Sequence, residues 1–302
     1  MSSLHQDIPI TRVQAWILAA RPKTLPAAVV PVLVGSAVAA AHGLFAWLPA
    51  LVALVCALLI QVGTNFANDY FDFLKGADSA ERIGPLRVVQ SGLIKATTVR
   101  NAMIGVFALT FILGLYLVYI GGWPILVIGV ASLFCAVIYT AGPFPLAYIG
   151  LGDVFVFLFF GIVAVTGTYF VQALEWSADA FIASLPVGAI STAILVVNNY
   201  RDIDTDRLAG KKTLAVRIGR GATRMEYALL LLLAYAVPLL QAFMQRQPLW
   251  LLLPLLSLPF AWKMFSVIRS TTDGGILNGV LAGTGRLLAF YGLLYSVGYL
   301  LI

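Results

Sequence analysis

Two short segments of the chain concentrate carboxylate and amide side chains at helical spacing. Their members are Asn68, Asp69 and Asp72 in the first segment and Asn198, Asp202 and Asp206 in the second. Residues three or four apart share one face of a helix, so each segment directs two or three oxygen ligands toward one point. Oxygen ligands without cysteine or clustered histidine favour a hard cation, and Mg²⁺ commonly binds through a few carboxylates plus a substrate's phosphates. The two segments therefore predict a magnesium site.

Basic residues follow each acidic segment. They are Lys75, Arg82 and Arg87 after the first segment and Arg207, Lys211 and Lys212 after the second. Cationic side chains form strong hydrogen bonds with phosphate oxygens, so two acidic stripes flanked by bases fit a diphosphate bridged by a metal ion. The alternative is that all these residues are solvated charges at helix ends. Two matched clusters favour the site, because only 11% of the chain is charged.

The two segments also resemble each other. Asn-Asp-Tyr-x-Asp begins at Asn68, and Asn-Asn-Tyr-Arg-Asp begins at Asn198. The similarity suggests that the chain contains a duplicated half.

The helices that carry these segments are predicted to lie in a membrane. Hydrophobic residues make up 61% of the 302 residues, and charged residues make up 11%. A soluble domain has about 25% charged residues. A membrane span needs about 20 mostly apolar residues. We therefore expect a single all-α, polytopic membrane domain over residues 1–302, with residues 1–20 as a short cytoplasmic N-terminal tail. The nine predicted transmembrane helices lie near 25–43, 47–68, 102–121, 124–141, 151–172, 180–199, 227–245, 248–266 and 281–301.

The distribution of basic residues predicts the orientation of these helices. With nine spans, every Lys and Arg except Arg246 falls on the side of the N-terminus, whereas Glu175 and Asp179 fall on the other side. Cytoplasmic loops carry an excess of Lys and Arg, so we expect a multi-pass protein of the cell membrane with its N-terminus in the cytoplasm and its C-terminus outside. A basic face of this kind attracts either anionic lipids or an anionic substrate.

These segments resemble the paired signatures of the UbiA superfamily of intramembrane prenyltransferases. Gly76 stands where many members have a third acid, and Asp78 follows two positions later. More narrowly, the chain is similar to the branch of the superfamily that acts on 1,4-dihydroxy-2-naphthoate in menaquinone biosynthesis. The motifs that carry the resemblance are Ala20-Arg-Pro-Lys-Thr-Leu-Pro26, Asn68-Asp-Tyr-Phe-Asp72, Lys75-Gly76-Ala-Asp78, Arg82-Ile-Gly-Pro-Leu-Arg87, Tyr139-Thr-Ala-Gly-Pro-Phe-Pro-Leu146, Gly150-Leu-Gly-Asp153, the segment 198–216 and the segment 277–287.

The resemblance implies a UbiA-like bundle of nine helices and a specific reaction. A polyprenyl or phytyl chain would pass from its diphosphate to 1,4-dihydroxy-2-naphthoate with loss of CO₂, giving demethylmenaquinol and diphosphate. Mg²⁺ would be the cofactor, and the partners would be the two substrates and membrane lipid, with no nucleic acid. Because loss of CO₂ replaces removal of a proton, no strong base is required. The two histidines, His5 and His42, are expected in the tail and on the outer side.

The resemblance also assigns roles to individual residues. Asp69, Asp72, Asp202 and Asp206 would be catalytic and would hold the metal ion together with Asn68 and Asn198. The diphosphate would be bound by Lys75, Arg82, Arg87, Lys211 and Lys212. Further substrate contacts are expected from Arg21, Lys23, Tyr70, Tyr139, Tyr200 and Arg201. Aromatic rings, including Phe155 and Phe157, would shield an allylic cation through cation–π contact.

Two other functions are compatible with the sequence. A UbiA-type enzyme could use another aromatic acceptor, such as 4-hydroxybenzoate, homogentisate or haem. A secondary transporter also carries intramembrane acids, but it would place them at the bilayer midplane beside broken helices, without a basic cluster after each acidic stripe.

Overall fold

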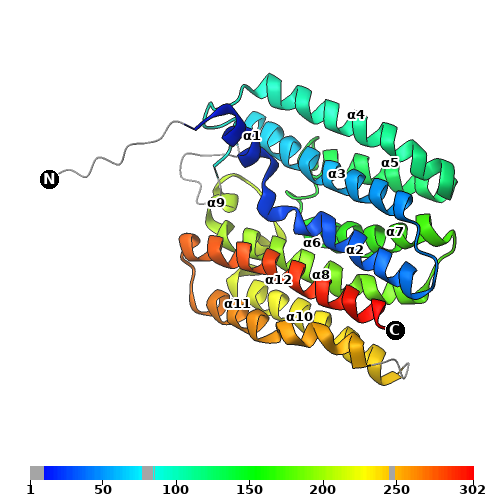
Figure 1. The fold of residues 1–302 in the computed structure, drawn as a ribbon. Helices are drawn as coiled ribbons and strands as arrows, with labels where there is room; N and C mark the ends of the chain where they lie inside the picture. The colour runs from blue at the N-terminus through cyan, green and yellow to red at the C-terminus, as the bar shows by residue number, and fades with distance from the viewer. Residues whose placement is uncertain (1–9, 77–83, 85, 245–248) are drawn as a thin grey trace.

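A computed structural model describes residues 10–76, 84, 86–244 and 249–302, and the regular structure of this part of the chain is entirely helical. The long helices run alongside one another in a bundle, with the short helix α1 at one end (Figure 1). The helices are α1 (Arg12–Ala20), η1 (Pro22–Thr24), α2 (Pro26–Ala41), α3 (Trp47–Leu74), α4 (Ala96–Gly121), α5 (Trp123–Ile138), α6 (Gly152–Val156), η2 (Phe157–Val163), α7 (Ala164–Ala173), α8 (Ala178–Arg201), α9 (Ile203–Leu208), α10 (Leu214–Met244), η3 (Leu249–Ser257), α11 (Leu258–Ser270) and α12 (Gly274–Leu300).

The helical membrane architecture predicted from the sequence is confirmed, although the number of nine spans is not. Within the described residues, seven helical stretches are long and apolar enough to cross a bilayer, and a bent pair brings the number to eight. The bent pair consists of Arg12–Thr24 and Pro26–Ala41, which meet at 49°. The predicted span 124–141 forms α5, which is apolar but has only 16 residues. Helices are suited to this environment because they satisfy their backbone hydrogen bonds internally.

The bend between α1 and α2 is a feature that the sequence did not predict. Residues 12–20 were expected in a tail, but they form a helix whose Ala15 and Ala19 are buried against α3. Arg21 ends this helix in the left-handed conformation, with φ 52°. That conformation costs an L-residue about 1–2 kcal/mol. The short helix η1 follows Arg21 and carries Thr24 toward α3, where its hydroxyl accepts hydrogen bonds from two side chains.

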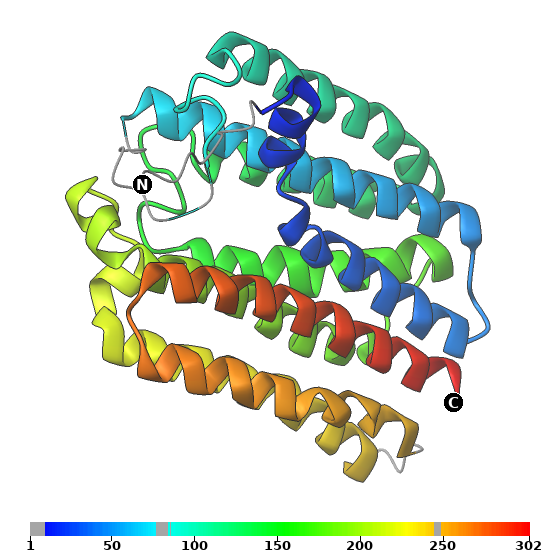
Figure 2. The ribbon, with the colours of Figure 1, turned by 60° about the vertical axis from the view of Figure 1, so that its left-hand side comes forward.

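The most deeply buried part of the bundle is formed by α2, α8, α10 and α12 (Figure 2). In the apolar window of α8, 78% of the residues are buried, the highest share among the candidate spans. Fully buried tyrosines from α10 and α12, including Tyr227, Tyr291 and Tyr295, fill this core. The second acidic segment, at the C-terminal end of α8, is therefore attached to the best-anchored helix of the molecule.

Two glycines allow η2 and α8 to approach each other closely on the side of the bundle that faces α3. A Cβ atom on Gly161 would lie 2.6 Å from the Cα atom of Gly188, so η2 packs on α8 at a distance that only glycine permits. The η2 segment is a π-helix, a form that is rare and frequent at functional sites. On the other side of the molecule, α3 packs along α4 and α5.

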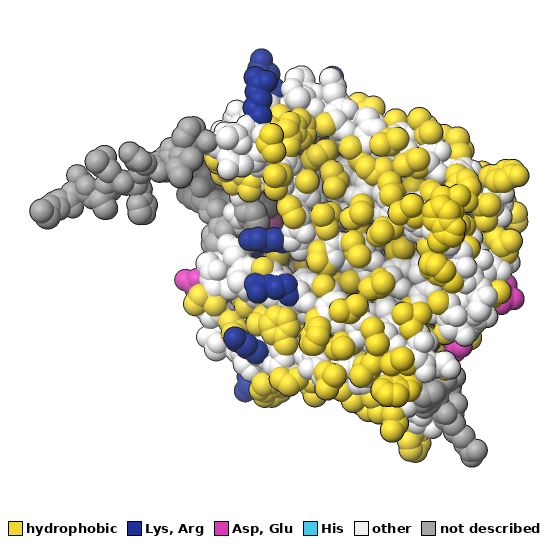
Figure 3. All heavy atoms as spheres, viewed as in Figure 1, with side chains coloured by type: hydrophobic (Ala, Val, Ile, Leu, Met, Phe, Trp, Pro, Cys, Tyr) yellow, Lys and Arg dark blue, Asp and Glu magenta, His cyan; other side chains and the backbone are white. Residues whose placement is uncertain are grey.

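The surface has two kinds of region. In Figure 3, Lys and Arg side chains gather toward the end of the bundle at which α1 lies, and hydrophobic side chains cover most of the remaining face. This distribution matches an integral membrane protein with one basic end.

Candidate active site

The C-terminal ends of α3 and α8 border one cavity of about 450 Å³. Both acidic segments contribute to its wall, so the structure brings together the two groups that the sequence predicted. The members of the two predicted segments that lie on the wall are Asn68, Asp72, Asn198, Asp202 and Asp206.

Arg87 connects the two aspartates of the first segment. Its guanidinium group donates to Asp69 Oδ1 at 2.6 Å and to Asp72 Oδ2 at 2.9 Å. Arg21 also donates to Asp69 Oδ1 at 2.6 Å, and the amide of Val88 donates to Oδ2 of the same residue at 3.2 Å. Asp69 is only 1% exposed and is not part of the cavity wall. Asp69 therefore holds two arginines in place, whereas Asp72 faces the cavity.

Tyr148 is a site residue that sequence reasoning missed. Its hydroxyl donates to Asp72 Oδ1 at 2.7 Å. The ammonium groups of Lys75 and Lys211 each lie 4.7 Å from the centroid of its ring, and Lys211 Nζ lies 3.4 Å from Asp72 Oδ1. Lys75 also donates to the carbonyl oxygen of Thr140 at 2.6 Å. Burial lowers the pKa of Lys75, and the neighbouring Asp72 opposes this shift.

The second acidic segment has its own arginine. The side chain of Arg201 donates to both carboxylate oxygens of Asp202, at 2.7 and 2.6 Å, and to Asn198 Oδ1 at 3.0 Å. It also donates to Asn278 Oδ1 at 2.8 Å, which attaches the segment to α12. Arg201 is 3% exposed and lies off the cavity wall. The structure thus places this predicted substrate contact behind the carboxylate that it orients.

The other predicted site residues fall into three groups. Those on the cavity wall are Arg21, Arg87, Tyr139 and Lys211. Those away from the wall are the exposed Lys23 and Lys212, together with Tyr70, Lys75 and Tyr200. Arg82 and Asp78 lie outside the described residues.

Tyr200 has a packing role in this structure. It is fully buried, and the guanidinium groups of Arg220 and Arg224 each lie 5.4 Å from the centroid of its ring. Its hydroxyl accepts from Arg224 Nε at 2.8 Å and donates to the carbonyl of Thr271 at 3.3 Å. Asp204, next to the second segment, forms an ion pair with Arg220 at 2.7 Å. These contacts connect α8 and α9 to α10.

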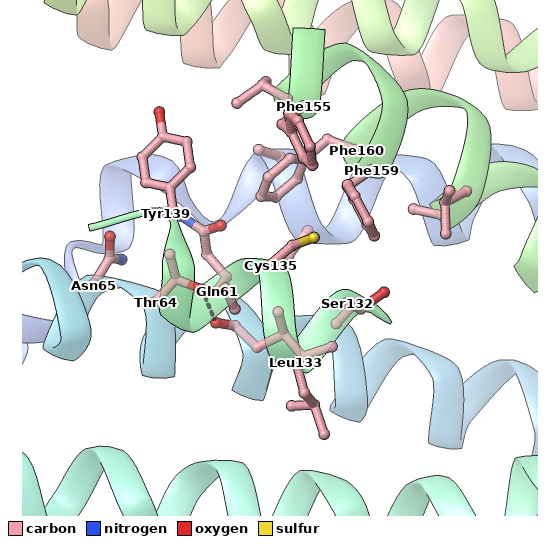
Figure 4. A pocket seen from close by; sticks show the side chains of 18 of the residues that line it. Gln61, Thr64, Asn65, Ser132, Leu133, Cys135, Tyr139, Phe155, Phe159 and Phe160 are labelled. Carbon is pink, nitrogen blue, oxygen red and sulfur yellow. Dashed lines mark hydrogen bonds between the residues drawn. The ribbon is translucent and has the colours of Figure 1, made fainter. Parts of the chain in front are cut away.

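The rest of the cavity is mainly apolar and extends along α4, α5 and the stretch from α6 to α7. Figure 4 shows Phe155, Phe159 and Phe160 on one side of this part and Gln61, Thr64 and Asn65 of α3 on another, with Tyr139 and Cys135 of α5 nearby. A polar, charged end therefore opens into a long apolar region, which suits a ligand with an anionic head and a hydrocarbon tail.

The donor set fits Mg²⁺ when the metal is shared with a ligand. Among the described residues, no group of three or more His, Cys, Asp or Glu side chains is placed to hold a metal ion by itself. The wall instead offers carboxylate and amide oxygens close to the cations of Arg21, Arg87 and Lys211. A carboxylate has about four lone-pair positions, so pairing with arginine leaves it capacity to bind a metal. Mg²⁺ typically completes such a partial protein set with phosphate oxygens and water.

Comparisons with known proteins agree with this description. Residues 28–276 match the UbiA prenyltransferase family. The chain is 37% identical to the 1,4-dihydroxy-2-naphthoate octaprenyltransferase of Escherichia coli (strain K12), over 97% of each chain. It is 40% identical to the protein of the same name from Mycobacterium tuberculosis, over 89% of this chain and 91% of the other.

Solved structures show the same fold at low sequence identity. A UbiA homolog from Archaeoglobus fulgidus, bound to GPP and Mg²⁺, superposes with a TM-score of 0.69 at 15% identity, over 95% of this chain and 100% of the other. A digeranylgeranylglyceryl phosphate synthase superposes with a TM-score of 0.63 at 16% identity, over 96% of this chain and 99% of the other.

Proposed function

Because the chain belongs to the UbiA prenyltransferase family, we propose that it transfers a polyprenyl or phytyl chain from its diphosphate to 1,4-dihydroxy-2-naphthoate. The products are demethylmenaquinol, CO₂ and diphosphate, as in the menaquinone pathway. The observation that carries this proposal is the single cavity in which both acidic segments meet beside Arg21, Arg87 and Lys211 and which continues into an apolar region. The full-length similarity to 1,4-dihydroxy-2-naphthoate octaprenyltransferases supports the choice of acceptor.

The polar end of the cavity binds the diphosphate. Asp72, Asp202 and Asp206, with Asn68 and Asn198, would hold Mg²⁺, which when bound offsets the charge that develops on the departing diphosphate (all five residues line the cavity). Arg21 and Lys211 on the same wall supply further positive charge toward the phosphate oxygens. Arg87, which also lines the wall, holds Asp72 in a fixed orientation, and Arg201 does the same for Asp202 from behind the wall.

The chemistry requires positioning and a dry cavity more than a proton acceptor. The bond between the prenyl carbon and the diphosphate oxygen breaks, and the resulting allylic cation forms a new carbon–carbon bond with the ring. The bond between that ring carbon and its carboxylate then breaks, CO₂ leaves, and the electron pair of the broken bond restores aromaticity. Tyr139, Phe155 and Phe159 line the cavity and stabilise the cation through their rings, an interaction worth about 2 kcal/mol when desolvated.

No histidine is needed for these steps. His42 lies at the far end of α2, where Nδ1 is 2.8 Å from the Tyr169 hydroxyl and Nε2 is 3.2 Å from Asp179. The apolar region along α4, α5 and α7 takes up the prenyl chain. The basic end of the bundle, which carries the site, faces the cytoplasm, with the N-terminus inside and the C-terminus outside the cell membrane.

The test is a competition assay with purified protein in detergent. The mixture contains Mg²⁺, a radiolabelled prenyl diphosphate, carboxyl-labelled 1,4-dihydroxy-2-naphthoate and an equal amount of 4-hydroxybenzoate. We expect the prenylated naphthol and labelled CO₂ in equal amounts, with little prenylated benzoate. Preference for 4-hydroxybenzoate, or a naphthoate product that keeps its carboxyl group, would assign the chain to another acceptor.

The transporter alternative makes a different prediction. In this structure the acids lie at the C-terminal ends of α3 and α8 among basic side chains, and not in the middle of these helices. A prenyltransferase releases diphosphate as the prenylated product forms, whereas a transporter forms no such product in this assay.

A further inference from the structure

Two buried oxygens in the cavity wall have no hydrogen-bond partner. Gln61 of α3 is 7% exposed and Ser191 of α8 is 3% exposed, and both line the cavity. Within the described part of the chain, no group bonds to Gln61 Oε1 or to Ser191 Oγ. A buried polar atom without a partner costs free energy, so each such atom in a native structure needs an explanation. A ligand that brings a hydrogen-bond donor into the cavity provides one.

The orientation of the Gln61 amide follows from its neighbours. The Thr24 hydroxyl donates to the carbonyl of Arg21 at 2.9 Å, so its oxygen can only accept from side chains. It accepts from Gln61 Nε2 at 2.9 Å and from Asn65 Nδ2 at 3.2 Å. The amide nitrogen of Gln61 must therefore face Thr24, which leaves Oε1 as the unpartnered atom. The bend after α1 places Thr24 here, so it also determines which atom Gln61 offers to a ligand.

The two oxygens occupy matching positions on matching helices. Gln61 stands seven residues before Asn68, and Ser191 stands seven residues before Asn198, the first residue of each acidic segment. Seven residues are about two helical turns, or about 10 Å, and return to the same helix face. Both oxygens thus lie at a similar depth below the diphosphate-binding end, on the two helices that carry the acids.

A hydrocarbon chain cannot satisfy these atoms, because it has no donor. The aromatic acceptor can, and its flat ring also suits the neighbouring Phe155 and Phe159 (Figure 4). We infer that Gln61 and Ser191 bind the ring of the acceptor through its hydroxyl groups, an assignment that rests on the proposed function. In 1,4-dihydroxy-2-naphthoate the 1-hydroxyl donates an intramolecular hydrogen bond to the adjacent carboxylate. The 4-hydroxyl is therefore the free donor, and it donates to Gln61 Oε1, whereas the Ser191 hydroxyl donates to the oxygen of a ring hydroxyl group.

The experiment measures binding of two acceptors to the whole protein in detergent, by equilibrium dialysis without prenyl diphosphate. The acceptors are 1,4-dihydroxy-2-naphthoate and 1-hydroxy-2-naphthoate, which lacks the 4-hydroxyl. We expect Gln61→Met to weaken binding of the first about tenfold and binding of the second hardly at all, since one hydrogen bond is lost only in the first case. Ser191→Ala should weaken binding of 1,4-dihydroxy-2-naphthoate several-fold. In turnover assays, the KM for the prenyl diphosphate should stay unchanged in both variants.

Thr64→Val is the matched control. Thr64 also lines the cavity on α3, but its hydroxyl already donates to the carbonyl of Ile60 at 2.7 Å, so its loss should leave acceptor binding unchanged. Gln61→Met removes a donor from Thr24 and could disturb folding, whereas Ser191 Oγ has no bond to lose among the described residues. Ser191→Ala therefore decides the matter if the Gln61 variant is unstable.

Three results would overturn the assignment. They are unchanged naphthoate binding in Ser191→Ala, equal weakening of both acceptors in Gln61→Met, and an increase of the KM for the prenyl diphosphate that matches the loss of acceptor binding. If the wild-type protein prenylates the naphthoate while a variant binds it normally, the assignment alone fails. If the wild-type protein neither binds nor prenylates the naphthoate, the proposed function fails as well.

Discussion

The Tyr148 hydroxyl donates a hydrogen bond to Asp72 Oδ1 at 2.7 Å, across 76 residues of chain. The ammonium groups of Lys75 and Lys211 each lie 4.7 Å from the centroid of the Tyr148 ring. One side chain thus links an acid of the first segment to a base that follows the second. Tyr148 orients the carboxylate and keeps two cations at the charged end of the cavity.

Substitutions of Tyr148 separate these two effects. Tyr148→Phe keeps the ring and its cation–π contacts but removes the hydrogen bond to Asp72. We expect kcat/KM for prenyl transfer to fall about tenfold, the effect of one bond to a charged group. Tyr148→Leu also loses the ring, and a fall on the order of a hundredfold is expected. Wild-type kinetics in both variants would show that Tyr148 only packs.

Sequence reasoning found the residues whose role follows from local spacing. Asp72, Asp202 and Asp206 were found because helical periodicity placed the acids of each segment on one helix face. The structure puts all three on the cavity wall. Tyr148 was missed because its partner is far away in sequence and its own segment is a turn without periodicity. Two motifs of the resemblance flank Tyr148, one ending at Leu146 and one beginning at Gly150, but neither includes it.

The fold shows the same limit. Apolar stretches predicted a helical membrane protein, since hydropathy depends on composition alone. The bend at Arg21 was not predicted, because a left-handed arginine has no sequence signature and is stabilised by contacts such as its bond to Asp69. Residues 12–20 form an apolar stretch of only nine residues, too short to be recognised as a span, so the helix that packs on α3 through Ala15 and Ala19 was missed.

Removal of a carboxylate from the cavity wall should abolish metal binding and, with it, the activity. Asp72→Ala and Asp202→Ala each leave too few oxygens to hold a hard cation against its hydration. We expect no measurable prenyl transfer in either variant, and none in the wild-type protein after treatment with EDTA, with activity restored by added Mg²⁺. Elution at the wild-type volume in size-exclusion chromatography confirms folding. Unchanged turnover in EDTA would refute the metal site.

Asp69 should behave differently from Asp72. It lies off the cavity wall and pairs with Arg21 and Arg87. Breaking a buried ion pair costs about 3–5 kcal/mol when the remaining charge stays buried. Asp69→Asn should therefore lower the Tm in detergent, while the Mg²⁺ concentration for half-maximal activity stays close to the wild-type value. A large increase in that concentration would identify Asp69 as a metal ligand, the role that the sequence predicted for it.

The proposed orientation can be tested by labelling of single cysteines. In a background without Cys56 and Cys135, a cysteine at the exposed Lys212 should react with a membrane-impermeant maleimide only when the cytoplasmic face is accessible. A cysteine at the exposed Glu175, near the opposite end, should react in intact cells. The excess of Lys and Arg on one side motivates this expectation. Reaction of the Lys212 site from outside would reverse the topology and place the active end outside the cell.

The length of the transferred chain should depend on three glycines in the apolar part of the cavity. Gly114 of α4, Gly129 of α5 and Gly167 of α7 all line it. A Cβ atom on Gly114 or Gly129 would meet no atom within 4 Å, and one on Gly167 would meet only Ile128, at 3.8 Å. Helix packing does not require these glycines, so their effect is to leave room for a ligand.

Filling that room should favour shorter substrates. We expect Gly129→Leu to lower kcat/KM for a long prenyl diphosphate about tenfold or more, with little change for geranyl diphosphate, because added methylenes exclude only the part of the chain that reaches them. Gly105→Leu is the control, since Gly105 is an exposed α4 residue with the same open surroundings but no place in the cavity wall. An equal loss for both substrates would mean that Gly129 affects folding or the site as a whole. An unchanged preference would mean that the chain follows another route.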